Sequence, residues 1–265
     1  MISYFEKIYK IISSLVYAES RKYFYASIFS ICLLIYLVFT FAMSTRALVI
    51  TFSPHDTFFL LDGAWRIFEG DVPNVDFHDV IGPLSYAIVA FGMQIHGPSS
   101  MAVLYASATL FAVFILMVWI ISITRVSPIL ALLFSMISAL GIIGNFGISF
   151  PGISYVGIYN RYAYSFLSGI FIYSFLVEKI KYQNSRGMLN IASNLVAGIF
   201  LMAILLTKFT FFPIALSAII LRSIFYKFSI KDVTELVAGS IAFLIFCYLW
   251  FGFNLNLISY SRPFW

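Results

Sequence analysis

Acidic side chains are unevenly distributed along this chain, and they are the residues best suited to chemistry. Six of the eleven Asp and Glu residues lie between Asp56 and Asp79, where the only basic residue is Arg66. Carboxylates gathered in this way can act as general bases or, together with His55 and His78, can bind a divalent metal ion. The sequence has no HxH or HExxH pattern to link these groups, so the metal interpretation is the weaker one.

The composition of the chain indicates that these acids belong to a membrane protein. Hydrophobic residues make up 62% of the sequence and charged residues only 10%, which is far outside the range of water-soluble domains. A helix needs roughly 20 apolar residues to cross a bilayer, and short charged connectors separate several runs of that length. We therefore expect an all-α, polytopic transmembrane bundle of about seven spans. The net charge of +5 is assigned to cytoplasmic loops, so no nucleic-acid partner is expected.

The expected spans belong to a single transmembrane domain that covers residues 1–265. Residues 1–22 are expected to be a cytoplasmic amphipathic segment or a frayed basic tail, residues 44–99 an external acidic loop, and residues 100–265 the remaining spans. Basic residues in the connectors place the N-terminus in the cytoplasm. The predicted spans are Tyr23–Ala42, Met101–Ile123, Pro128–Phe150, Tyr162–Val177, Met188–Leu206, Phe209–Tyr226 and Leu236–Leu257.

Two short helices are predicted within the external loop. Apolar residues recur at helical spacing from Leu60 to Phe68, and Gly70 and Pro73 mark the end of that helix and the turn after it. The second segment, Pro83–His96, is apolar but only 14 residues long. It is too short to span a bilayer, so we expect it to lie along the outer interface.

Asp56 differs from the other acids of this loop in its position. It follows the first span closely, at a depth where an unpaired carboxylate is costly and is usually retained for function. We therefore expect it to serve catalysis or ligand binding, and N-capping of the first short helix is the alternative. Asp62 and Arg66 are four residues apart and are predicted to form a weak ion pair on a solvated helix face.

Five features follow one another between residues 55 and 97: Asp56, Gly70 with Pro73, Asp76-Phe77, Gly82-Pro83-Leu84 and His96-Gly97. In this order they resemble the first extracytoplasmic loop of GT-C glycosyltransferases. These polytopic enzymes, which include protein O-mannosyltransferases and lipid A aminoarabinose transferases, take a sugar from a polyprenyl-phosphate donor. A looser similarity extends to "YNRYAY" at residues 159–164 and "LMAILLTKFTFFPIAL" at residues 201–216. The chain departs from the family in having Thr57 after the acid and no basic residue before Pro83, and it covers only the seven-helix module.

The resemblance implies an inverting transferase at the outer face of a bacterial inner membrane, with Asp56 as the base and no cofactor. Its expected partners are a polyprenyl-phosphate-linked sugar, membrane lipids and a lipid, glycan or protein acceptor. For Arg161 and Lys208 the alternatives to phosphate binding are interfacial anchoring and snorkelling to lipid headgroups. The candidates for donor-phosphate binding are Arg161, Lys208 and His78, and those for the acceptor loop are His55, Asp76, Asp79, Trp65 and Tyr155.

Two other functions are consistent with the sequence. A transporter or flippase for a lipid-linked saccharide would contain charged or broken spans, and Pro213 is the one residue that interrupts a predicted span near its middle. A non-catalytic GT-C module or subunit would fit the short chain. Cys32 and Cys247 lie in separate apolar runs and are expected to be free thiols.

Overall fold

The computed structural model describes residues 21–45, 54–77, 81–143, 157–176, 187–226 and 228–251. Within these ranges every regular element is helical, apart from one isolated bridge between Pro73 and Phe77. The expected all-helical class is therefore confirmed for this part of the chain. The helices are α2 (Arg21–Ser44), α3 (Pro54–Glu69), α4 (Pro83–His96), α5 (Met101–Ile123), α6 (Pro128–Ile143), α7 (Ile158–Phe175), α8 (Met188–Thr207), the short 3₁₀ helix η2 (Phe209–Phe211), α9 (Phe212–Phe225) and α10 (Ile230–Phe251).

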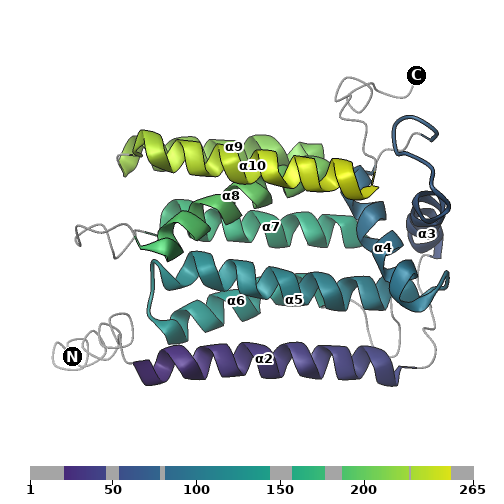
Figure 1. The fold of residues 1–265 in the computed structure, drawn as a ribbon, viewed down its shortest axis with the longest axis horizontal. Coiled ribbons are helices and arrows are strands. Elements are labelled where there is room, and N and C mark those ends of the chain that lie inside the picture. Colours follow the sequence, from purple (N-terminus) through teal and green to yellow (C-terminus); the bar gives the residue numbers. More distant parts are fainter. Residues whose placement is uncertain are drawn as a thin grey trace, which may run out of the picture.

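Helices α2 and α5 to α10 lie side by side along the long axis of the molecule, and α3 and α4 lie at one end of this bundle (Figure 1). At each end of the bundle, a hydrogen bond joins segments that are far apart in the sequence. At the end that carries α3 and α4, the amide of Gly82 donates to the carbonyl of Thr207 at 3.2 Å. At the opposite end, Arg125 Nε donates to the carbonyl of Tyr173 at 3.3 Å. We refer to these as the Asp56 end and the Arg125 end.

Four helices in the described residues are long and apolar enough to cross a membrane: Lys22–Ser44, Met101–Ile123, Met188–Thr207 and Ile230–Trp250. Helices α6 and α9 are apolar but shorter, at 16 and 14 residues. Large apolar side chains cover the outside of the bundle, and Phe41, Ile137 and Leu249 are each more than 60% exposed. Such a surface is suited to contact with lipid chains. The protein is therefore a helical membrane protein.

Helix α8 lies at the centre of the bundle and packs very closely against α10. In the 18-residue apolar stretch of α8, 67% of the residues are buried inside the bundle, whereas the corresponding share is 17% in α2 and in α10. A Cβ atom on Gly198 would overlap the carbonyl of Leu236, and one on Gly239 would overlap the carbonyl of Leu195. Ser240 Oγ also donates to the carbonyl of Gly198 at 3.2 Å. Glycine at both positions therefore allows the two backbones to touch.

Two buried arginines hold the helices together at the Arg125 end. Arg125 Nη1 donates to Ser193 Oγ at 2.7 Å, and Arg222 Nη1 donates to the carbonyl of Tyr173 at 2.7 Å. Both guanidinium carbons lie 4.6 Å from the centroid of the Tyr173 ring, within the range of cation–π attraction. Because Arg125 and Arg222 are only 3% and 4% exposed, these contacts replace the water that each charge would otherwise bind.

Asn194 extends this cluster to the start of α10. Tyr173 Oη donates to Asn194 Oδ1 at 2.8 Å, and Asn194 Nδ2 donates to Asp232 Oδ1 at 3.1 Å and to Glu235 Oε2 at 2.8 Å. Asp232 Oδ2 also accepts from the amide of Ser229 at 2.8 Å, while the amide of Asp232 donates to Ser229 Oγ at 3.3 Å. This is a reciprocal N-terminal cap. The sequence-based start of the last span, Leu236, is wrong for this reason, because the cap starts the helix at Ile230.

Two other predicted segments agree with the observed helices, whereas the predicted interruption of a span at Pro213 does not. The segments Met101–Ile123 and Pro83–His96 coincide with α5 and α4. Pro213 is not near the middle of a span, because η2 precedes it and it lies in the first turn of α9, where proline is well tolerated. Residues 1–20 and the predicted span ends at residues 150, 177 and 257 lie outside the described residues.

Candidate active site at the Asp56 end

The carboxylate of Asp56 links the start of α3 to the start of α7. Helix α3 begins at Pro54, so Asp56 lies in its first turn and is not the N-cap, contrary to the alternative considered from the sequence. Asp56 Oδ2 accepts from the amide of Gly157, 101 residues away, at 3.3 Å. Gly157 has a φ of +63°, a conformation that glycine adopts readily. Asp56 remains partly exposed, so the described residues do not enclose its carboxylate.

Lys208 reaches the same turn of α7 from the end of α8. Its backbone is extended between α8 and η2, and its amide ends α8 by donating to the carbonyl of Ile204 at 2.8 Å. Its ammonium donates to Asn160 Oδ1 and lies 4.8 Å from the centroid of the Tyr159 ring. The side chain is therefore directed onto protein groups at this end of the bundle, not away from them towards lipid headgroups.

Tyr159 lies in the first turn of α7, two residues after Gly157 and next to Asn160. The Lys208 ammonium lies 4.8 Å from the centroid of its ring, within the range of cation–π attraction.

The N-terminus of α4 packs directly beside Lys208. The Gly82 amide bonds to the carbonyl of Thr207, the residue before Lys208. A Cβ atom at Gly82 would overlap the carbonyl of Leu206, so glycine is required for this close approach. Pro83 then occupies the first turn of α4, a position that proline favours. The Gly82-Pro83-Leu84 element thus positions α4 against the end of α8.

The remaining candidate residues lie at different distances from Asp56 and Lys208. Arg161 follows Asn160 on the same turn of α7 and is half-buried, and His55 is exposed next to Asp56. Asp76 instead accepts from the amide of Val72 at 2.7 Å and closes a local turn. Trp65 lies nine residues along α3 from Asp56, roughly 14 Å along the helix axis, and packs on Phe68. His78, Asp79 and Tyr155 lie outside the described residues.

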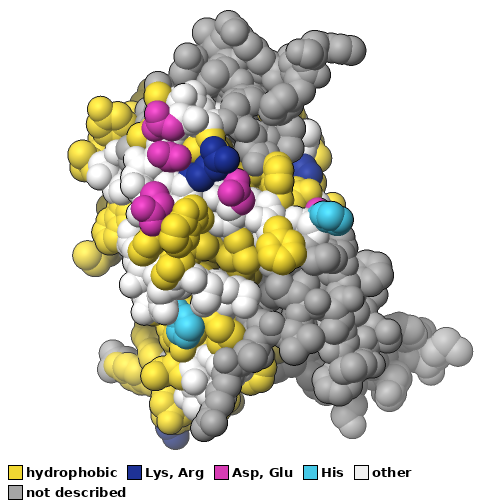
Figure 2. Space-filling view, turned by 90° about the vertical axis from the view of Figure 1, so that its right-hand side faces the viewer, with side chains coloured by type: hydrophobic (Ala, Val, Ile, Leu, Met, Phe, Trp, Pro, Cys, Tyr) yellow, Lys and Arg dark blue, Asp and Glu magenta, His cyan; other side chains and the backbone are white. Residues whose placement is uncertain are grey.

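The outer face of α3 carries exposed charged side chains beside exposed aromatic ones, such as Phe58 and Trp65. Figure 2 shows acidic side chains gathered around a basic one at this end of the molecule. Arg66 Nε lies 3.1 Å from Asp62 Oδ2, and the two side chains are 44% and 65% exposed. The predicted ion pair on a solvated face is confirmed, and exposed pairs of this kind contribute little to stability. Arg66 also lies over Phe77, 5.5 Å from the ring centroid, which holds the turn after α3 against the helix.

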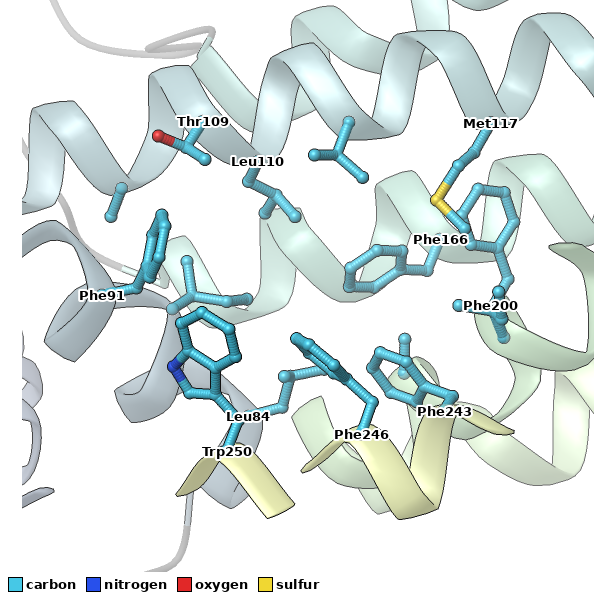
Figure 3. Close-up of a pocket in the computed structure, with 15 residues that line it drawn as sticks. Leu84, Phe91, Thr109, Leu110, Met117, Phe166, Phe200, Phe243, Phe246 and Trp250 are labelled. Carbon is cyan, nitrogen blue, oxygen red and sulfur yellow. The ribbon is translucent and has the colours of Figure 1, made fainter. Parts of the chain in front are cut away.

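Side chains of α4, α5, α7, α8 and α10 line an apolar groove (Figure 3). Its volume is about 300 Å³. Phe91 and Trp250 meet at one end of it with ring centroids 6.0 Å apart, and Met117, Phe200 and Phe243 line the other end. Because Val113, Phe246 and Trp250 are each about half exposed, the groove opens on the outside of the bundle. Leu84, two residues after Gly82, also lines it, so it extends towards the Asp56 end.

Asp56 and Lys208 supply a carboxylate and an ammonium group, which can take part in acid–base chemistry and bind anions. Within the described ranges, no three His, Cys, Asp or Glu side chains come together in a way that could hold a metal ion. Gly157 and Asn160, which bind Asp56 and Lys208, carry no signal in the sequence, because each contact joins segments far apart in the chain. Comparisons with protein families, with curated proteins and with solved structures found no match for this chain.

Proposed function

We propose that this protein is a glycosyltransferase that takes a sugar from a polyprenyl-phosphate donor and transfers it to a lipid, glycan or protein hydroxyl at the membrane surface. One observation carries the proposal: Asp56 and Lys208, from distant parts of the chain, both bind the first turn of α7 at one end of a membrane-spanning bundle. A carboxylate and a cation at the bilayer surface are the groups needed to activate a hydroxyl and to stabilise a departing phosphate.

The proposed reaction is a single displacement. The acceptor hydroxyl gives its proton to the Asp56 carboxylate as its oxygen bonds to the anomeric carbon of the sugar. The bond between that carbon and the phosphate oxygen breaks, and its electron pair leaves with the polyprenyl phosphate. Lys208 and Arg161 stabilise the charge on this leaving group. Attack from the face opposite the phosphate inverts the anomeric centre.

The apolar groove offers a place for part of the donor's hydrocarbon chain. Its lining comes almost entirely from apolar and aromatic side chains, and its one hydroxyl, on Thr109, is already bonded to the carbonyl of Tyr105. Burial of hydrocarbon in such a groove favours binding by dispersion contacts. Since the groove extends towards Leu84 and the start of α4, a bound chain can lie in the bilayer while its phosphate reaches the surface.

The proposed topology places the Asp56 end outside the cell. Helices α2 and α5 to α10 are the seven spans, while α3 and α4 lie at the outer interface. The basic residues Lys22, Arg125, Arg222 and Lys231 belong to the Arg125 end, and residues 54–77 carry five acids and one arginine. This distribution supports a cytoplasmic N-terminus. A bacterial inner membrane is the proposed location.

The proposal is tested by supplying the purified full-length protein in lipid vesicles with a panel of polyprenyl-phosphate sugars. With water or an added alcohol as the acceptor of the sugar, we expect release of polyprenyl phosphate, faster with a long-chain donor than with a short-chain one. Lys208→Gln should weaken turnover at least tenfold, whereas Lys231→Gln, an exposed cation at the opposite end, should have no effect. Absence of turnover with every donor, in protein shown to be folded, would instead favour a non-catalytic module.

A further inference from the structure

The inner end of the apolar groove lies where α8 and α10 cross. The two backbones touch at Gly198, where a Cβ atom would overlap the carbonyl of Leu236 and where Ser240 Oγ donates to the glycine carbonyl. From this crossing towards the Asp56 end, residues that follow on both helices line the groove, beginning with Ile199 on α8 and Phe243 on α10. The crossing therefore bounds the groove on the side of the Arg125 end.

A tightly held ring forms the wall at this inner end. Phe200 lines the groove and is buried. Its ring centroid lies 5.3 Å from that of Phe114 and 5.7 Å from that of Phe166. A Cβ atom on Gly169 would overlap the same ring, so the backbone of α7 also lies against it. These three contacts fix the Phe200 ring at the end of the groove.

The lining of the groove indicates what occupies it. Val113, Phe246 and Trp250 are each about half exposed, so the groove opens at the level of the membrane-spanning helices, where lipid chains surround the protein. The hydroxyl of Thr109 is bonded to the carbonyl of Tyr105. Aromatic faces pack by dispersion against flat unsaturated groups, which favours a polyisoprenoid over a saturated chain. Six of the fifteen lining residues are aromatic: Phe91, Phe166, Phe200, Phe243, Phe246 and Trp250.

The depth of the groove limits how much of a chain it can hold. On α5 the lining residues run from Ala106 to Met117, which is a rise of about 16 Å along the helix axis. This is about half of the hydrocarbon thickness of a bilayer, which is about 30 Å. A chain that is longer than the groove must therefore leave it and continue in the bilayer.

We propose that the groove binds the phosphate-proximal isoprene units of a polyprenyl phosphate, and that Phe200, held by Gly169, is the stop that sets how many units it accepts. The inference rests on the proposed function for the role of this lipid as the sugar donor. Leu84 lines the groove two residues after Gly82, whose amide bonds to the residue before Lys208. The phosphate of a bound chain therefore lies towards the Asp56 end.

The first test measures how binding depends on chain length. Geranyl, farnesyl, geranylgeranyl and longer polyprenyl monophosphates compete with radiolabelled farnesyl phosphate for the full-length protein in detergent. Affinities are expressed as mole fractions in the detergent, so that partition into micelles does not enter the comparison. Affinity should rise with length until the chain fills the groove, at about geranylgeranyl phosphate, and then stay level. Affinity that keeps rising up to the longest chain would show that the groove has no stop and would overturn the inference.

The second test moves the stop in opposite directions. Phe200→Leu deepens the groove, so a longer chain should be needed to reach the level, and that chain should gain about fourfold or more in affinity, as expected from burying one further methylene. Gly169→Ala pushes the Phe200 ring into the groove, so a shorter chain should reach the level. Phe111→Leu truncates a buried ring that is not part of the lining and should keep the wild-type profile. An unchanged profile in folded Phe200→Leu, or the same shift in both groove variants, would overturn the inference.

The third test identifies the kind of chain. A saturated alkyl phosphate with as many main-chain carbons as geranylgeranyl phosphate should bind severalfold more weakly, because it offers no flat unsaturated groups to the aromatic lining. Equal affinity of the two phosphates would assign the groove to ordinary membrane acyl chains and would overturn its assignment to an isoprenoid.

Sugar transfer then separates this inference from the proposed function. If no donor is turned over but the binding profiles shift as expected, the glycosyltransferase proposal fails and the isoprenoid site with its stop at Phe200 stands. If transfer occurs but the binding profile of Phe200→Leu equals that of the wild type, the proposed function stands and this inference fails.

Discussion

At the residue scale, backbone amides and neutral side chains hold the charged groups of the candidate site. Gly157 binds Asp56, and Asn160 binds Lys208. Residue type and position in the sequence were enough to select Asp56 and Lys208, because a charge near the end of an apolar run is costly wherever the chain folds. The residues that bind them could not be selected, because an amide or a glycine becomes informative only when its partner is known.

The cluster at the Arg125 end leads to a prediction about Asn194. Its side chain links Tyr173 with Asp232 and Glu235, and it is 2% exposed. Asn194→Ala removes a hydrogen-bonding partner from two buried groups and from the partly buried Glu235, and should cost about 2 kcal/mol or more. Thermal unfolding in detergent should show a Tm lower by several degrees, with Met188→Ala on the exposed side of the same helix close to wild type. A Tm unchanged by Asn194→Ala would contradict the structural role given to this cluster.

At the scale of elements, hydropathy predicts where most helices lie but not how they begin or how closely they pack. The bounds of α5 and α4 follow from apolar runs that end in polar residues. The start of α10 does not, because its first two turns carry Lys231, Asp232 and Glu235 and resemble a connector. The signal that could have placed it is the Ser-x-x-Asp spacing of its cap, Ser229 with Asp232.

Close packing of α8 on α10 predicts different outcomes for two glycines. Gly198→Ala would put a methyl group onto the carbonyl of Leu236 and force the helices apart, at a cost of about 1–3 kcal/mol. Gly187→Ala, one residue before α8, meets nothing within 4 Å and has an ordinary φ of −67°. It should therefore be neutral. Equal effects of the two substitutions on thermal stability would show that α8 and α10 do not touch at Gly198.

At the scale of the whole molecule, the structure is a bundle with chemically different ends. Acids dominate α3 and the turn after it, whereas buried arginines close the opposite end. Composition predicted a membrane bundle, and the positions of the charged residues predicted the separation of charge along the chain. The apolar groove was not predictable, because side chains from α4, α5, α7, α8 and α10 form it together and none of these helices shows it alone.

The two ends predict how the molecule is oriented in a membrane. A cysteine introduced as Glu69→Cys in α3 should react with a membrane-impermeant maleimide in intact cells. One introduced as Lys231→Cys at the start of α10 should react only after the membrane is opened, with the unmodified protein giving the background from Cys32 and Cys247. The reverse pattern would place the Asp56 end in the cytoplasm.

The central claim is that the Asp56 carboxylate is the base for sugar transfer, and a comparison of two acids on one helix tests it most directly. Asp56→Asn keeps the shape of the side chain but removes the base, so sugar transfer should fall by a factor of about 100 or more. Asp62→Asn changes an exposed acid six residues further along α3 and should keep the wild-type rate at equal expression. Transfer that survives Asp56→Asn, or is lost equally in both variants, would contradict the claim.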